Sequence, residues 1–259
     1  MIKLENTQVL GWEAAIRGMR NPMNSWEKSD SRWTVNYPDD VIRVDTDGEE
    51  FYDLVIGPND QKLMMNLARA GSVDAKYRRM IVVTVDITAP LYWWKEFDTY
   101  KVGTVANSCS TMHKIHDKEF TIEDFSHEHL IEDAWTTEDI CFTAHDSSGE
   151  LLDFTGLDFL EDCIISALND YRKAYLATKN KKYWWQMIQL LPSSYNQRRT
   201  VMLNYEVLAG IYPKRKDHKL DEWHEFCDWI KSLPYSEIIT LEKTTGGVKC
   251  KPNSILATK

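Results

Sequence analysis

One run of the sequence is strongly β-forming and constrains the fold class more than any other feature. Residues 80–88 read Met-Ile-Val-Val-Thr-Val-Asp-Ile-Thr, and Ala89-Pro90 closes the run. β-Branched side chains lose χ1 freedom in a helix but pack well on a pleated surface, so this run predicts a strand. Elsewhere apolar residues recur every three or four positions, which is the period of an amphipathic helix. The chain is therefore predicted to be mostly helical around at least one strand.

Five segments carry helix signals. The helix predicted at residues 58–70 begins at Pro58 and ends before Gly71. Its apolar face is expected to consist of Leu63, Leu67 and Ala70. Tyr212-Pro213 is expected to separate the last two helices. Residues 24–50 are polar and are predicted to form a long loop. The predicted helices cover residues 12–19, 58–70, 157–180, 203–211 and 222–233.

The charge of the chain is unevenly distributed. It has 31 Lys and Arg against 40 Asp and Glu, a net charge of −9. This excess of acid argues against binding to nucleic-acid polymers or anionic membranes, which basic surfaces favour. Residues 117–162 hold 15 acidic residues and one basic residue, Lys118, so the rest of the chain is mildly basic. We expect one domain over residues 1–259 that carries this acidic segment, which is usually just a solvated face.

Two observations bear on the compartment. The first residues include Glu5 and Glu13 and lack the apolar core of a signal peptide, and no stretch has 18 uncharged apolar residues. The five cysteines are an odd number, are widely spaced and form no CxxC pair. These features favour a cytoplasmic protein with free thiols.

The histidines do not form a recognised metal motif. His113, His116, His127 and His129 lie in one window, and their spacing would allow pairs to converge on a metal. However, no HExxH or comparable ligand spacing is present, and surface histidines beside carboxylates are common. We therefore expect no metal site.

A polar stretch and a basic cluster are candidates for binding an anion. After the predicted strand come an aromatic run that begins at Tyr92 and a run of small polar residues, 104–111. Hydroxyls, an amide and backbone N–H groups at this density suit a phosphate or a polar ring edge; a buried aromatic helix followed by a Ser/Thr-rich turn is the alternative. Residues 195–219 carry six cations against Glu206 and Asp217. This cluster suits an anion, or only complements a helix dipole.

The order of these features resembles the flavin-dependent thymidylate synthases. In that family a strand ending in proline precedes an Arg-Gln pair, an Arg-His-Arg triplet and a Ser in a polar loop. Here residues 84–90 match the strand, Lys95-Glu96 the pair and Thr99-Tyr100-Lys101 the triplet. Cys109, flanked by Ser108 and Ser110, falls on the Ser, and Thr111 falls on a following Arg.

A second segment, residues 191–223, also matches the pattern of this family. Leu191-Pro192 is followed by Asn204, where the family has an Asn that contacts flavin, and by Arg215, where it has an Arg that contacts the nucleotide. His218 and Trp223 follow.

The chain also departs from the family pattern. Of the three residues at the position of the Arg-His-Arg triplet, only Lys101 is charged. A Lys side chain cannot form the bidentate hydrogen bonds that an Arg guanidinium forms. Ile188 and Glu206 stand where the family has a nucleotide-side Arg and a flavin-side Arg. By this resemblance the chain is a divergent member that lacks the Arg-His-Arg motif.

The resemblance implies a fold, ligands and an assembly. The fold is a single α+β domain with a central, mainly antiparallel sheet flanked by several long helices, and the assembly is a homotetramer. The ligands are FAD and a dUMP-like pyrimidine deoxynucleotide, with NADPH and methylenetetrahydrofolate as further co-substrates. The implied substrate-binding residues are Lys101, Ser108, Cys109, Ser110, Thr111 and Arg215. The implied cofactor-binding residues are Thr99, Tyr100, Lys101 and Asn204; Tyr92, Trp93 and Trp94 pack either against flavin or in the core.

Three functions remain open at this point. The first is a flavin-dependent methyltransferase of the thymidylate synthase type, in which no residue is assigned as catalytic. The second is a non-catalytic homologue that keeps the fold for nucleotide binding or oligomeric contacts. The third is an acidic protein-interaction module that shares only ancestry with the family, because fold alone does not establish activity.

Overall fold

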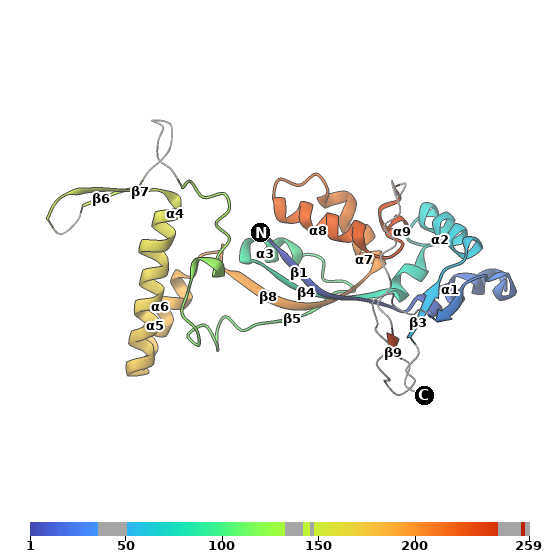
Figure 1. The fold of residues 1–259 in the computed structure, drawn as a ribbon, viewed down its shortest axis with the longest axis horizontal. Coiled ribbons are helices and arrows are strands. Elements are labelled where there is room, and N and C mark those ends of the chain that lie inside the picture. Colours follow the sequence, from blue (N-terminus) through green and yellow to red (C-terminus); the bar gives the residue numbers. More distant parts are fainter. Residues whose placement is uncertain (36–50, 133–141, 146–147, 243–254, 257–259) are drawn as a thin grey trace. The chain divides into compact units, whose positions relative to one another are not determined.

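The computed structural model describes residues 1–35, 51–132, 142–145, 148–242 and 255–256. Figure 1 shows helices and antiparallel strands along the chain. The strands are β1 (Lys3–Leu10), β2 (Arg32–Val35), β3 (Phe51–Val55), β4 (Val82–Pro90), β5 (Val105–Ser108), β6 (Phe142–His145), β7 (Leu151–Phe154), β8 (Asn196–Asn204) and β9 (Ile255–Leu256). The α-helices are α1 (Trp12–Arg20), α2 (Pro58–Ala70), α3 (Leu91–Phe97), α4 (Gly156–Asp158), α5 (Ser166–Thr178), α6 (Lys181–Leu190), α7 (Tyr205–Arg215), α8 (Asp221–Ser232) and α9 (Glu237–Thr240).

The chain folds into two compact units. The first contains residues 1–3, 88–99 and 107–199, and the second contains residues 4–87, 100–106 and 200–259. The expectation of one domain over residues 1–259 stays a prediction.

The main sheet has the strand order β1-β4-β8-β5. The Leu91 amide donates to the Tyr195 carbonyl, and the Tyr205 amide donates to the Ile81 carbonyl, so β4 and β8 run antiparallel. The smaller sheets, β2-β3-β9 and β6-β7, are also antiparallel. The predicted α+β class with a mainly antiparallel sheet is confirmed.

The β-branched run behaves as its sequence predicts. Along β4 buried and half-buried positions alternate, and Val83, Val85 and Ile87 are fully or almost fully buried. Successive side chains of a strand point to opposite faces, so β4 gives one complete face to the core. The second unit packs α8 beside the sheet, where the Trp229 indole donates to the Thr7 hydroxyl over 3.0 Å.

The first unit is built on aromatic and aliphatic side chains. Trp93, Trp94 and Phe97 of α3 are at most 2% exposed, and Trp94 donates to the Gln197 carbonyl over 2.9 Å. Trp93, Trp94 and Phe97 are therefore core residues, whereas Tyr92 is half-buried. A second cluster in this unit packs along α5 and α6 and consists of Ile115, Phe120, Phe125, Leu160, Ile165, Leu168 and Met187.

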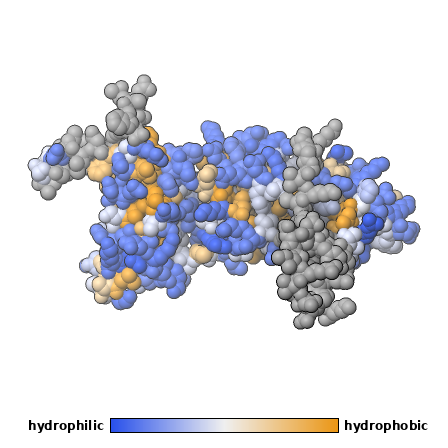
Figure 2. Space-filling model, viewed as in Figure 1, coloured by the Kyte–Doolittle hydropathy of each residue, from blue (hydrophilic) through white to orange (hydrophobic). Residues whose placement is uncertain are grey.

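The predicted helix at 157–180 is present with one irregularity. Its first part, Phe159–Ile165, is a π-helix that continues directly into α5. A π segment adds one residue to the turn and is uncommon in long runs. Figure 1 shows α5 and α6 side by side, and Figure 2 shows apolar residues reaching the surface of this region.

Three predictions about elements were wrong. β2 lies inside the predicted loop at 24–50, of which residues 36–50 fall outside the described chain. The predicted helix at 203–211 begins only at Tyr205, because Leu203 and Asn204 end β8, and it continues through Pro213 to Arg215. Pro213 lies in the last turn, where its missing N–H removes a single backbone bond.

The apolar face of α2 is also displaced from the prediction. The buried residues are Asp60, Met64 and Ala68, whereas Leu63 is half-buried and Ala70 is exposed. A buried aspartate decides which face of α2 turns inward. Helical spacing alone cannot indicate this, because it treats a carboxylate as a surface group.

Asp60 is buried with Arg20 in a network that joins α1, α2 and the segment between them. The Arg20 Nε donates to Asp60 over 2.7 Å, and both charged side chains are almost inaccessible. The second carboxylate oxygen of Asp60 accepts from the Ser29 and Ser31 hydroxyls over 2.7 and 2.6 Å. Burial raises the pKa of Asp60, but hydrogen bonds from Ser31, Ser29 and Arg20 outweigh it and hold this pKa below its usual value.

Within the described residues, no helix is long and apolar enough to cross a membrane.

Asp60→Asn is expected to lower the free energy of unfolding at pH 7 by about 3–5 kcal/mol, because it leaves the Arg20 charge buried without its partner. The folded pKa of Asp60 is lowered, so its stabilisation is complete above the unfolded pKa of about 3.9 and is lost as pH falls through the folded value. The difference between wild type and variant should shrink below about pH 4. Urea unfolding at several pH values measures both effects.

Asp74→Asn is the matched control, because Asp74 is exposed. It should change the free energy of unfolding by no more than about 0.5 kcal/mol. A loss below about 1 kcal/mol for Asp60→Asn, constant over pH, would contradict the assignment of Asp60 as a buried ionised group.

Candidate functional site

Arg215 is the centre of an aromatic and cationic cluster in the second unit. Its Nε donates to the Tyr100 hydroxyl over 2.8 Å. Its guanidinium carbon lies 4.5 Å from the Trp223 ring centroid and 5.5 Å from that of Tyr100. Trp223 is fully buried, and its ring meets those of Tyr100 and His218 edge to face at 6.2 Å. The hydrogen bond and the cation–π contacts hold the orientation of the half-buried guanidinium.

Local structure explains the position of these residues. Arg215 is the last residue of α7, and Trp223 lies in the first turn of α8. The His218 Nδ1 accepts from the Leu220 amide over 3.1 Å and so orders the connection between the two helices. The sequence resemblance named Arg215, His218 and Trp223, and the structure brings them together with Tyr100.

Asn204 caps the start of α7. Its side-chain oxygen accepts from the Val207 amide over 3.0 Å, which satisfies one of the free N–H groups at the helix start. Gly103 packs against this cap with φ of +80°, and a Cβ on Gly103 would lie 3.0 Å from Val207 and 3.3 Å from the Asn204 Nδ2. Asn204 therefore has a structural role through its oxygen, and its Nδ2 lies close to Gly103.

Glu206 has a structural partner. Its carboxylate accepts from the Arg78 Nε over 2.8 Å, and Arg78 also donates to the Ile238 carbonyl over 3.1 Å. Arg78 is 5% exposed, so the pair is largely desolvated. Glu206, which stands where the resemblance puts an Arg, is thus one partner of an internal ion pair. Sequence reasoning missed Arg78, although its position two residues before the β-branched run was a signal that it lies near the sheet.

The three residues that match the triplet, Thr99, Tyr100 and Lys101, are divided between the two units. Thr99 belongs to the first unit, where its hydroxyl donates to the Glu96 carbonyl over 2.7 Å and closes the end of α3. Tyr100 and Lys101 belong to the second unit, and Lys101 is exposed. Of the three, only Tyr100 joins the Arg215 cluster.

The polar loop at 108–111 lies in the first unit. The Cys109 amide donates to the Arg198 carbonyl over 2.9 Å, and its carbonyl accepts from Gln197 over 2.8 Å. The Ser110 hydroxyl accepts from the amides of Met112 and His113 over 3.3 and 2.9 Å. Ser108, Cys109 and Ser110 are exposed, and Thr111 is half-buried. Their fixed backbone presents two hydroxyls and the Cys109 thiol to solvent.

The cysteines of the described residues are free thiols, as expected for Cys109, Cys163 and Cys227. Burial raises the pKa of the Cys227 thiol to about 11, so this thiol is held in its unreactive protonated form. Cys141 and Cys250 fall outside the described residues.

Part of the basic cluster at 195–219 is structural. The Arg199 guanidinium stacks over the Trp94 ring at 4.1 Å and donates to Asp98 over 2.7 Å and to Gln197 over 2.9 Å. Its charge is therefore already matched inside the first unit.

The histidine window forms no metal site among the described residues. The His116 ring packs against Tyr175 at 4.9 Å. His127 pairs through Nδ1 with the Phe125 carbonyl over 3.0 Å, and His113 and His129 are exposed.

Ile188 packs against the apolar cluster along α5 and α6. By the resemblance, this is the position of a nucleotide-side Arg, and here it holds a half-buried apolar side chain at the edge of the cluster.

Known structures share this fold. Thymidylate synthase X (ThyX) from Helicobacter pylori, solved with FAD and dUMP, is 13% identical over 93% of this chain and 98% of its own, with a TM-score of 0.56. The UMP/dUMP methylase PolB from Streptomyces cacaoi, solved with 5-Br dUMP, is 12% identical over 93% of this chain and 94% of its own, with a TM-score of 0.55. No family model matches the sequence, and a comparison with curated proteins gave no match. At this identity the similarity establishes the fold alone.

Gly103→Ala is expected to lower the free energy of unfolding by about 1–3 kcal/mol, because it combines a left-handed backbone with a crowded Cβ against the cap of α7. Gly149→Ala is the control, since Gly149 has φ of +86° and, among the described residues, no atom lies within 4 Å of its Cβ position. Thermal unfolding compares the two variants. Equal losses would show that only the backbone conformation matters and that Gly103 does not support the cap.

Proposed function

We propose that this protein is a divergent, FAD-dependent, thymidylate synthase-like enzyme that acts on a dUMP-like pyrimidine deoxynucleotide. The observation that carries the proposal is the Arg215 cluster. Tyr100 and Trp223 orient one guanidinium in a partly desolvated position, where a charge-assisted bond to phosphate is strong. The similarity of fold to ThyX with FAD and dUMP, and to PolB with 5-Br dUMP, supports the same ligand class.

Two residues of this chain are suited to hold the cofactor. The Asn204 Nδ2 is a donor for a polar edge of flavin, and the exposed Lys101 supplies a positive charge for a pyrophosphate. Glu206 is neutralised by Arg78, which removes much of the repulsion that a free carboxylate would exert on that pyrophosphate. When bound, reduced flavin supplies the hydride, with NADPH as reductant and methylenetetrahydrofolate as one-carbon donor. The residues of the chain hold and orient the nucleotide.

The resemblance also assigns residues of the polar loop and Lys101 to the substrate. In this proposal Ser108, Ser110 and Thr111 of the first unit supply hydroxyls, and Lys101 of the second unit supplies a cation. Cys109 lines the site in this proposal and is assigned no catalytic role. Cytoplasmic location and a homotetrameric assembly belong to the same proposal.

A non-catalytic homologue is the second candidate. Ile188 supports it, because a half-buried apolar residue replaces a nucleotide-side cation of the family. Such a protein binds the nucleotide through Arg215 without carrying out the chemistry.

Titration of the purified chain with FAD and with dUMP tests the proposal. Absence of binding by either ligand up to about 1 mM, where the binding free energy is about −4 kcal/mol, would exclude it. NADPH oxidation that depends on dUMP identifies the enzyme, whereas dUMP binding without flavin identifies the non-catalytic homologue.

Arg215→Ala is expected to weaken dUMP binding by about 1.5–3 kcal/mol, because it removes a charge-assisted contact. Tyr100→Phe keeps the ring and removes only the hydroxyl that accepts from Arg215, so it should cost about 0.5–1.5 kcal/mol. Isothermal titration calorimetry measures both. Arg69→Ala, which removes an exposed charge from the last turn of α2, is the control and should leave dUMP binding unchanged. Equal affinity of wild type and Arg215→Ala would remove Arg215 from the substrate site.

A further inference from the structure

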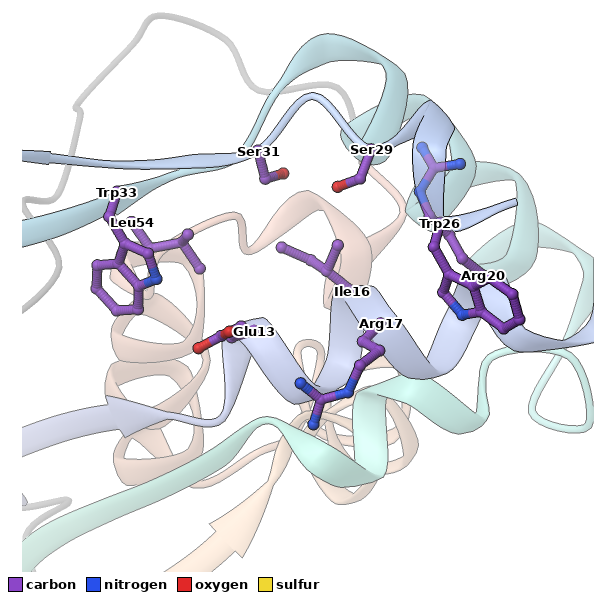
Figure 3. Close-up of a pocket in the computed structure, with 9 residues that line it drawn as sticks. All are labelled: Glu13, Ile16, Arg17, Arg20, Trp26, Ser29, Ser31, Trp33 and Leu54. Atoms are coloured by element: carbon purple, nitrogen blue, oxygen red, sulfur yellow. The ribbon is translucent and has the colours of Figure 1, made fainter. Parts of the chain in front are cut away.

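A cavity of about 310 Å³ lies beside α1 in the second unit (Figure 3). Its lining comes from α1, the segment at 26–31, and the β2-β3 hairpin. None of these residues belongs to the Arg215 cluster. The volume is at the lower end of the range typical for small-molecule sites, about 300–1,000 Å³.

One wall of the cavity is the Arg20–Asp60 network. The three nitrogens of the Arg20 guanidinium donate to Asp60, to the Ser25 carbonyl and to the Lys28 carbonyl. The hydroxyls of Ser29 and Ser31, which also line the cavity, donate to Asp60. This wall is therefore preformed and electrically balanced, and it does not need a ligand to complete it.

The two other charged residues of the lining have opposite signs. Glu13 and Arg17 lie one turn apart on the exposed side of α1. Residues at this spacing are able to pair, but within the described part of the chain neither side chain forms a hydrogen bond or an ion pair. Their positions also complement the helix dipole, which gives each a modest role without a ligand.

Two indole rings bound the cavity. Trp26 is 48% exposed and Trp33 is 43% exposed. In Figure 3 they lie at opposite ends, with Ile16 between them. The Trp26 Nε1 donates to Asn21 over 2.8 Å, and Trp33 is held in the β2-β3 ladder opposite Leu54. Two fixed, half-exposed tryptophans on either side of an isoleucine form an apolar channel that suits an aromatic or branched group.

We propose that this cavity binds a free α-amino acid with an aromatic or large apolar side chain. The α-carboxylate pairs with Arg17, the α-ammonium pairs with Glu13, and the side chain lies between the two indoles. A ligand with only a negative charge is repelled by Glu13, and one with only a positive charge by Arg17. The site is independent of the proposed nucleotide site, because the two share no residue.

The proposal is tested on the full chain with three probes of the same apolar body: L-phenylalanine, 3-phenylpropanoate and 2-phenylethylamine. Calorimetry or ligand-observed NMR gives the affinities. L-Phenylalanine is expected to bind with a dissociation constant of about 1 mM or below. Each analogue lacks one charge, so each should bind at least about tenfold more weakly.

Two variants assign the charges. Glu13→Gln should weaken L-phenylalanine and 2-phenylethylamine about tenfold and leave 3-phenylpropanoate unchanged or tighter. Arg17→Gln should weaken L-phenylalanine and 3-phenylpropanoate and spare 2-phenylethylamine. Glu27→Gln and Arg69→Gln are the controls, because both residues are exposed and neither lines the cavity.

Three results would overturn the proposal. The first is that L-phenylalanine shows no saturable binding to the folded chain up to about 10 mM. The second is that both variants bind L-phenylalanine with unchanged affinity. The third is that each variant loses the same affinity for all three probes. Titration with dUMP in the same variants keeps the two sites apart, since neither Glu13 nor Arg17 belongs to the nucleotide site.

Discussion

The buried pair of Arg20 and Asp60 is the interaction on which the N-terminal part of the second unit depends. It fixes the inward face of α2 and the end of α1, and its hydrogen bonds hold the segment at 25–31 in one conformation. Two charges without water are costly unless every polar atom has a partner, and here the surrounding carbonyls, hydroxyls and amides supply those partners. The amphipathic pattern of α2, the start of β2 and the wall of the cavity beside α1 all follow from satisfying one carboxylate.

The chain keeps the fold of the flavin-dependent thymidylate synthases while distributing charge in its own way. Arg215 is retained and held by aromatic rings, whereas Glu206 is matched by Arg78 and Ile188 packs at the edge of an apolar cluster. These replacements are consistent with their surroundings in this protein. Under the proposed function, Arg215 is the residue that binds the phosphate, while the charge of Glu206 is matched inside the protein by Arg78.

Some of the architecture follows directly from the sequence, and some does not. β4 was predicted because β-branched residues dominate it, and α8 because its apolar residues keep helical spacing. β8 was missed because its sequence, NQRRTVMLN, begins with polar and charged residues and has only Val201 and Leu203 as fully buried apolar residues. Pairing with β4 and β5 makes it a strand, and that is tertiary information. In the candidate site, the resemblance named Arg215, but the Tyr100 hydrogen bond and the Arg78 ion pair join residues more than 100 positions apart.

The π segment at Phe159–Ile165 has a consequence for how this chain tolerates changes in length. A wide turn of this kind holds one residue more than the α-helical turn it replaces. In a regular α-helix one extra residue would rotate everything that follows by about 100°, and the wide turn absorbs that residue so that α5 keeps its orientation. Deleting one residue here would let the turn relax to α-helix and leave Leu168 facing the same apolar cluster, whereas deleting one residue inside α5 would rotate the rest of that helix by about 100°. The π segment therefore makes this helix tolerant of a one-residue deletion at residues 159–165 but not further along α5.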